Sequence, residues 1–212
     1  MAQHQTYDER RQQIIQGALQ AFSDKGYLGA SNKDIALAAG INSAPLIYHY
    51  FENKEALFQA VIQECMPPVN MVAQAERWQA LPVRETLIHI GTEFVKAMSQ
   101  PQTVTLVRLL LGEALREPEV ANAIYKSGPA HVLGFLYSYF GDLMQQQRMN
   151  QADLGATVRC FIGPLLAYAL SSKILTFPDE KTPKEGTMVE TAITIFMNGM
   201  GLVEKEEHSL GR

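Results

Sequence analysis

Apolar residues recur at helical spacing along the whole chain, and this feature restricts the possible folds more than any other. No useful length of the sequence alternates between apolar and polar residues, as a half-buried strand would. In residues 8–25, for example, Ile14, Ala18 and Phe22 share one helical face, and Gly26 follows as a natural stop. The sequence therefore predicts an all-α protein.

Capping signals and prolines predict where the helices begin and end. Ser31 and Asp34 form a variant of the capping box that starts a short second helix, and Gly40 ends it. A third helix has Pro45 in its first turn, and a fourth begins near Asn53. Further helices are expected near residues 84–99, 102–116, 118–147, 151–176 and 187–205.

Charge and hydropathy narrow the classes of function. The chain of 212 residues has a net charge of -4, and its first 60 residues carry five basic and six acidic side chains. This balance argues against a non-specific nucleic-acid binder. The N-terminus lacks the apolar run of a signal peptide, and the longest low-charge stretch, residues 160–172, is shorter than the roughly 20 residues that span a membrane. We expect a cytoplasmic protein without a membrane segment.

The sequence also lacks the patterns of metal sites and of catalysis. Cys65 and Cys160 lie far apart, and none of the five histidines has a neighbour at metal-ligand spacing. No paired carboxylates, nucleophile–base motif or phosphate loop is found, and Glu113 with Arg116 is expected to form an i, i+3 helix pair. We therefore expect no metal, no cofactor and no enzyme activity.

The first three predicted helices have the arrangement of a helix-turn-helix unit. Two short helices joined by a glycine-containing turn, with the first helix bracing them, can place the last helix in the major groove of DNA. The residues expected in the core of this unit are Leu46, Ile47, Tyr50 and Phe51. Tyr48 and His49 project away from that core, where a phenol and an imidazole can bond to phosphate oxygens.

The segment "IIQGALQAFSDKGYLGASNKDIALAAGINSAPLIYHYFENKEALFQAV" resembles the N-terminal DNA-binding domain of the TetR family of transcriptional regulators. The matching marks are Ile14/Ala18/Phe22 before Gly26, Ser31 before Asp34-Ile35-Ala36, Ala39-Gly40, and Tyr48-x-Tyr50-Phe51-x-x-Lys54-Glu55. The resemblance implies a helix-turn-helix DNA-binding domain over residues 1–52 and a helical ligand-binding and dimerisation domain over residues 53–212.

The resemblance also implies which residues contact DNA. The expected phosphate contacts are Ser31, Lys33, Tyr48, His49 and Lys54. The expected base readers are Asn42, Ser43, Ala44, Pro45 and Leu46. Pro45 and Leu46 can touch thymine methyl groups, and Ser43 or Asn42 can bond to a base edge. Because the chain has one residue more between Gly40 and Tyr48 than the commoner family spacing, the individual bases are left unassigned.

The C-terminal part of the sequence carries a weaker resemblance. The segment "RLLLGEALREPEVANAIYKSGPAHVL" is similar to the C-terminal domains of one broad TetR branch. The candidate pocket residues are Trp78, Phe94, Met98, Arg108, Tyr125, His131, Phe135 and Tyr168, with a helical core as the alternative role for each. A mostly apolar pocket favours an apolar or amphipathic effector.

The last two predicted helices have apolar faces wider than one core contact needs. Two such helices from each of two subunits can form a four-helix bundle across a two-fold axis. The predicted dimer contacts are Phe161, Leu165, Ala169, Ile193, Phe196, Met197 and Met200, with an intramolecular core as the alternative.

The sequence-based hypothesis is a homodimeric, ligand-responsive transcriptional regulator, expected to be a repressor. It would bind a near-palindromic double-stranded operator and be released by a small effector. Two alternatives remain open. One is an activator or a ligand-independent regulator, and the other is a helical small-molecule carrier or enzyme that uses the apolar half.

Overall fold

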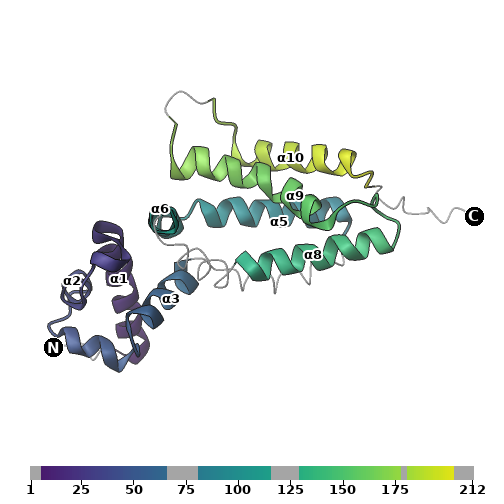
Figure 1. Cartoon of the computed structure of the whole chain (residues 1–212). Helices are drawn as coiled ribbons and strands as arrows, with labels where there is room; N and C mark the ends of the chain where they lie inside the picture. Colours follow the sequence, from purple (N-terminus) through teal and green to yellow (C-terminus); the bar gives the residue numbers. More distant parts are fainter. Residues whose placement is uncertain (1–5, 66–80, 116–128, 178–180, 203–212) are drawn as a thin grey trace, which may run out of the picture. The chain divides into compact units, whose positions relative to one another are not determined.

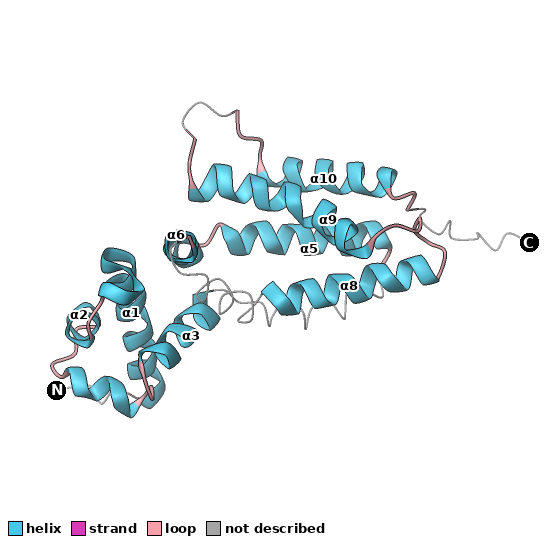
Figure 2. Ribbon diagram, in the orientation of Figure 1, coloured by secondary structure: helices cyan, strands magenta, loops and turns pink. Residues whose placement is uncertain are grey.

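The computed structural model describes residues 6–65, 81–115, 129–177 and 181–202. All regular structure within these ranges is helical, as predicted (Figure 2). The elements, labelled in Figure 1 except for η1 and η2, are α1 (Tyr7–Gly29), α2 (Asn32–Ala38), the 3₁₀ helix η1 (Ala44–His49), α3 (Lys54–Cys65), α5 (Val83–Met98), α6 (Pro101–Ala114), α8 (Pro129–Gln145), α9 (Leu154–Ala169), the π helix η2 (Leu170–Ile174) and α10 (Glu185–Gly199).

The described residues divide into two compact units. The first unit contains α1, α2, η1, α3 and α6, and the second unit contains α5, α8, α9, η2 and α10. Helix α6 therefore belongs with the N-terminal helices, although α5 precedes it in the chain. The expected division after residue 52 is a division by function, and it stays a prediction.

Helix α1 has clear local reasons for its start and its end. The Thr6 hydroxyl accepts a hydrogen bond from the Glu9 amide, and the Glu9 carboxylate accepts one from the Thr6 amide, which completes a capping box. Continuous helical geometry ends where predicted, at Gly26, with φ 76° and ψ 162°. At Gly17 the helix packs so closely on α2 that an added Cβ would lie 2.5 Å from Ala39.

Helix α6 completes the hydrophobic core of the first unit. Its Leu106, Leu109 and Leu110 pack with residues of α1, α2, η1 and α3. Burying each such side chain contributes about 1.5–3 kcal/mol. The buried Thr103 hydroxyl also donates to the Cys65 carbonyl at 2.6 Å, which fastens the start of α6 to the end of α3. The first unit is therefore built from two separate stretches of sequence.

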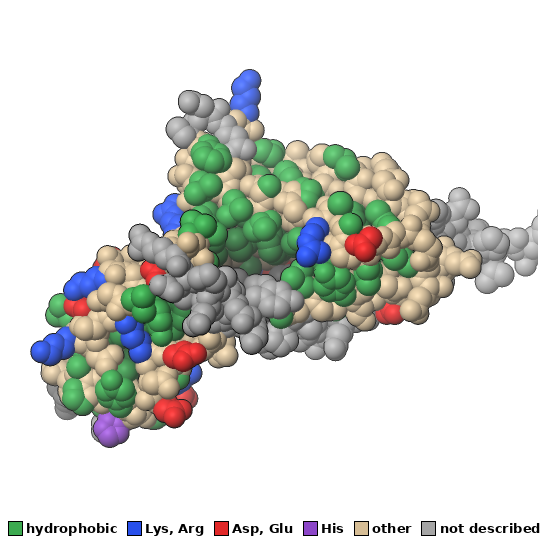
Figure 3. Space-filling model, in the orientation of Figure 1, with side chains coloured by type: hydrophobic (Ala, Val, Ile, Leu, Met, Phe, Trp, Pro, Cys, Tyr) green, Lys and Arg blue, Asp and Glu red, His purple; other side chains and the backbone are tan. Residues whose placement is uncertain are grey.

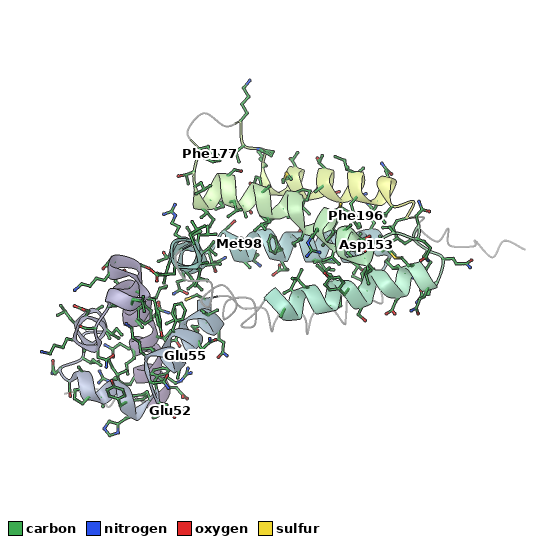
Figure 4. The ribbon with its side chains drawn as sticks, in the orientation of Figure 1. Glu52, Glu55, Met98, Asp153, Phe177 and Phe196 are labelled. Atoms are coloured by element: carbon green, nitrogen blue, oxygen red, sulfur yellow. The ribbon has the colours of Figure 1, made fainter. Side chains whose placement is uncertain are left out.

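Aromatic rings fill the core of the second unit. The ring centroids of Phe140, Phe161 and Phe196 lie 5.3–5.4 Å apart in edge-on and tilted pairs. Phe196 of α10 points into this cluster (Figure 4). On the face of the second unit seen in Figure 3, hydrophobic side chains also gather at the surface among few charged ones.

The stretch Leu154–Ile174, which comprises α9 and η2, is long and apolar enough to cross a membrane by length and composition alone. It exceeds the low-charge stretch found in the sequence because the helix runs through Arg159 and Lys173. Its Phe161 and Leu165 lie in the core of the second unit. A core helix of a soluble protein passes the same test.

Candidate nucleic-acid interface

Helix α2 begins with the capping box that the sequence predicts. The Asp34 amide donates to the Ser31 hydroxyl at 3.3 Å, and the Ser31 amide donates to the Asp34 carboxylate at 2.9 Å. Hydrogen bonds from Lys25 and Ser31, with the charge of Lys25, hold the Asp34 pKa well below its usual range. The Ser31 hydroxyl also donates to Asp34, so it is already engaged within the unit.

The predicted third helix is a 3₁₀ helix rather than an α-helix, and we call it the recognition turn (Ala44–His49). The Leu46 amide bonds to the Ser43 carbonyl and the Tyr50 amide to the Ile47 carbonyl, both three residues apart. The segment has only six residues, and short segments often adopt the tighter 3₁₀ geometry. Ser43 occupies the N-cap position of this segment without a side-chain capping bond.

Tyr48 projects outward, as predicted, with 56% of its surface exposed. Its hydroxyl accepts a hydrogen bond of 2.6 Å from Nδ2 of Asn32, the first residue of α2. This bond fixes the phenol at the junction of α2 and the recognition turn. Asn32 was not predicted, because nothing in the linear sequence pairs it with a tyrosine 16 residues away.

The remaining predicted base readers divide into two groups. Asn42, Ser43 and Pro45 are exposed, and so is the predicted phosphate contact His49. Ala44 and Leu46 are half-buried and pack against the first core, which leaves them less surface for a base. The exposed side chains are polar or small and carry no full charge.

The two predicted lysine contacts differ in orientation. Lys33 is exposed on α2. The ammonium of Lys54 turns inward instead and donates to the Leu28 carbonyl at 3.3 Å. It also lies 4.9 Å from the centroid of the Tyr27 ring and 5.9 Å from that of Phe22. Lys54 is thus bound by groups of its own unit.

Both halves of the chain match models of one regulator family. The model described as "Bacterial regulatory proteins, tetR family" matches residues 14–61. The model described as "AefR-like transcriptional repressor, C-terminal domain" matches residues 85–199, which is more than half of the chain. The chain belongs to the TetR family. It is a transcriptional regulator of that family, with its N-terminal helix-turn-helix and its C-terminal helical domain.

The curated relatives include proteins that are named for opposite effects on transcription. The HTH-type transcriptional repressor Rv1474c of Mycobacterium tuberculosis is 34% identical over 91 residues, which are 43% of this chain and 43% of that protein. The HTH-type transcriptional activator FasR of Mycolicibacterium smegmatis is 43% identical over 56 residues, 26% of this chain and 25% of that protein. The chain spans less than half of the length of these relatives.

Solved structures share the fold over most of the chain. A TetR family transcriptional regulator from Pseudomonas syringae pv. tomato has a TM-score of 0.70 at 20% identity and covers 95% of this chain and 100% of its own. The fatty acid degradation regulator FadR from Bacillus halodurans has a TM-score of 0.69 at 21% identity, covering 92% and 100%. FadR from Bacillus subtilis, solved in complex with stearoyl-CoA, has a TM-score of 0.68 at 18% identity. The match covers 89% of this chain and 98% of that one. At these identities the likeness concerns the fold alone.

The effector-pocket residues that the TetR resemblance suggested do not all lie in one unit. Phe94, Met98, Phe135 and Tyr168 belong to the second unit. Phe94 and Phe135 are half-buried beside its core, and the Tyr168 hydroxyl donates to the Pro183 carbonyl at 3.2 Å. Arg108 lies on α6 in the first unit, where it is exposed and lines a cleft together with Phe22 and Glu113. Trp78, Tyr125 and the side chain of His131 lie outside the described residues.

The predicted dimer contacts need a correction. Six of the seven are buried within the single chain, namely Phe161, Leu165, Ala169, Ile193, Phe196 and Met197, and Met200 is half-buried. These side chains pack α9 and α10 against their own unit, so the intramolecular alternative holds for them. The apolar residues that α9 and α10 leave exposed include Leu166, at 38% exposure, and Ile195, at 67%.

Proposed function

We propose that this protein is a dimeric, effector-responsive repressor that binds a near-palindromic operator through Tyr48 and the recognition turn. The observation that carries this proposal is the hydrogen bond from Asn32 to the Tyr48 hydroxyl, on an exposed surface. It holds a neutral donor in one orientation before DNA arrives, which lowers the entropy lost on binding. The chain would act in the cytoplasm, where the DNA is.

The proposed interface relies mainly on neutral groups. Tyr48, His49 and Lys33 would contact phosphates, and Asn42, Ser43 and Pro45 would meet base edges or thymine methyl groups. Ser31 has its hydroxyl engaged with Asp34, and Ala44 and Leu46 are half-buried, so we give these three a smaller share. Because few charged side chains would displace counterions from the phosphates, the affinity for DNA should depend only weakly on salt concentration.

The proposed dimer uses the outer faces of α9 and α10, rather than the buried residues first expected. Leu166 and Ile195 have exposed apolar surface there. A Cβ added at Gly163 of α9 would have open space around it, so this position also faces outward. A two-fold contact between these faces would place two recognition turns on one duplex. Helix-turn-helix dimers read half-sites about 34–36 Å apart.

The proposed effector binds in the second unit, beside Phe94 and Phe135. Half-buried aromatic rings at the edge of an apolar core suit an apolar or amphipathic molecule. Such an effector would release the operator if it favours a dimer geometry with a different separation of the recognition turns. The change in operator affinity then equals the difference in effector affinity between the two geometries.

The proposal is tested by fluorescence anisotropy of labelled DNA from upstream of the protein's own gene, with a scrambled duplex beside it. Tyr48→Phe and Asn32→Ala should each weaken binding to both duplexes, Tyr48→Phe by roughly tenfold, the cost of one hydrogen bond to a charged group. Asn42→Ala should instead reduce the preference for the operator. Tyr137→Phe, which removes a hydroxyl from the second unit, serves as the matched control.

The sign of regulation needs a separate measurement, because one relative is named an activator. In an in vitro transcription assay from the bound promoter, adding the protein should lower the amount of transcript. A rise in transcript would replace repression with activation. Operator binding by wild type and by Tyr48→Phe with equal affinity would contradict the assigned interface.

A further inference from the structure

A cleft of about 420 Å³ lies between α1 and α6 of the first unit. Phe22 and Gly26 of α1 line one side of it, and Leu109, Gly112 and Glu113 of α6 line the other. Clefts of roughly 300–1,000 Å³ commonly hold small molecules. No residue of the recognition turn contributes to this cleft, so the proposed DNA interface does not use it.

The cleft contains the buried carboxylate of Glu113. Only 6% of this residue's surface is exposed, and a Cβ added at Gly26 would lie 2.8 Å from its Oε1. The expected pairing with Arg116 concerns a residue outside the described ranges. Within those ranges, Glu113 forms no hydrogen bond and no ion pair. Because a carboxylate taken out of water is costly without a partner, a cation bound in the cleft would stabilise it.

The other groups around the cleft narrow the kind of cation that fits. Phe22 and Leu109 belong to the hydrophobic core of the first unit, so they give the cleft apolar walls. Arg108 also lines the cleft, but it is exposed, and water screens its charge more than the charge of the buried Glu113. The Lys54 ammonium does not line the cleft and bonds to the Leu28 carbonyl. These surroundings favour a cation with an apolar body.

We propose that this cleft binds a small organic cation, whose ammonium group pairs with Glu113 while its apolar body packs on Phe22 and Leu109. The site lies in the first unit and is therefore separate from the effector site proposed beside Phe94 and Phe135. Binding at this site does not depend on DNA, so the inference does not rest on the proposed function. A bound cation would link α1 to α6, which are the two separate stretches of sequence that build this unit.

The test compares three probes of similar size and shape on the full chain. Benzylamine is a cation at neutral pH, benzyl alcohol is neutral and benzoate is an anion. In an NMR titration of the ¹⁵N-labelled protein, benzylamine should bind roughly tenfold more tightly than benzyl alcohol, the gain from one hydrogen bond between charged groups. Benzoate should bind most weakly of the three. The signals that shift should include the amides of Gly26 and Gly112.

Two substitutions test the site in different ways. Glu113→Gln removes the charge and keeps the shape, so it should bind benzylamine no more tightly than benzyl alcohol. Gly112→Leu should weaken the binding of both probes, because Gly112 lines the cleft and an added Cβ there meets no atom within 4 Å. Replacing a helical glycine by leucine also favours the helix, so this variant should remain folded.

Each substitution has a matched control that should bind benzylamine as wild type does. Glu64→Gln removes an exposed carboxylate of α3, which bonds to Gln12 outside the cleft. Gly134→Leu makes the same change on α8 of the second unit, where an added Cβ also has open space. Circular-dichroism melting of each variant establishes that it is folded.

Several outcomes would overturn the inference. Equal affinity of wild type for benzylamine and benzyl alcohol would show that the carboxylate recognises no charge. Tighter binding of benzoate would mean that Arg108 determines the charge preference of the cleft. Unchanged benzylamine binding in Glu113→Gln, or signal shifts confined to the second unit, would place the cation elsewhere. Failure of wild type to bind any of the three probes would contradict the site itself.

Discussion

At the scale of single residues, Gly26 combines an unusual backbone conformation with a position next to the buried carboxylate of Glu113. Its φ of 76° and ψ of 162° lie in a region that residues with a side chain rarely enter. The space beside it is filled by the Glu113 carboxylate. The backbone conformation therefore requires glycine here, while the Glu113 carboxylate, at the end of a flexible side chain, can shift to admit a Cβ.

We expect Gly26→Ala to destabilise the protein by about 1–3 kcal/mol, the usual cost of forcing a side chain into this conformation. Urea unfolding followed by circular dichroism measures this. Gly29→Ala is the control, because an added Cβ there meets only Lys25 Cβ at an ordinary 3.9 Å. It should change stability by less than about 0.5 kcal/mol. Equal losses in both variants would contradict a special constraint at residue 26.

Sequence periodicity predicts the direction of individual side chains well when the helix has a single apolar face. It placed Tyr48 outside and Ile47 inside the first unit, as observed. It did not separate the core from the dimer interface at Phe161 and Ile193, because the pattern of apolar residues is the same for both kinds of contact. It also missed Asn32, since a side-chain hydrogen bond between two elements leaves no periodic trace.

At the scale of secondary-structure elements, the end of α1 and both ends of α2 were predictable because their signals are local. A capping box and a terminal glycine each involve only residues that lie within about four positions in the sequence. The type of the recognition turn was not predictable in the same way. Its bonds join residues three positions apart, and no local signal in a six-residue segment distinguishes this 3₁₀ geometry from a short α-helix.

The cap of α2 predicts a dependence of stability on pH. The folded-state pKa of Asp34 is depressed, so its contribution is fully present above the unfolded value near 3.9 and is lost as pH falls below it. The free energy of unfolding should therefore fall less steeply below about pH 4 in Asp34→Asn than in wild type. Lys25→Met, which removes the main partner, should flatten the profile in the same direction. Identical acid limbs in all three proteins would contradict this role.

The packing of α6 in the first unit predicts a large effect of Leu106→Ala. This side chain is fully buried, and its truncation should cost about 2–5 kcal/mol. Leu115→Ala, at an exposed position, should cost less than about 0.5 kcal/mol. Hydrogen exchange should report faster exchange of α1 amides in Leu106→Ala. Unchanged α1 protection would contradict the assignment of α6 to this unit.

At the scale of the whole molecule, the proposed dimer makes the exposed apolar side chain of Ile195 decisive. Ile195→Arg places a charge on the outer face of α10, where burial against a second subunit would be costly. Sedimentation equilibrium should give a dimer for wild type and a monomer for this variant, with operator affinity lost in parallel. Gln145→Arg on the exposed end of α8 is the control and should stay dimeric. A dimeric Ile195→Arg would move the interface to another surface.

The first unit is discontinuous in sequence, and this affects the design of chimeras between related regulators. The chain leaves this unit after α3 and returns to it with α6. A chimera joined after residue 65 would carry the DNA-binding helices of one parent and the α6 of the other. Its Leu106, Leu109 and Thr103 would then come from a sequence never selected to fit these helices. Successful hybrids should therefore carry α6 along with the helix-turn-helix, or repair its contacts by compensating substitutions.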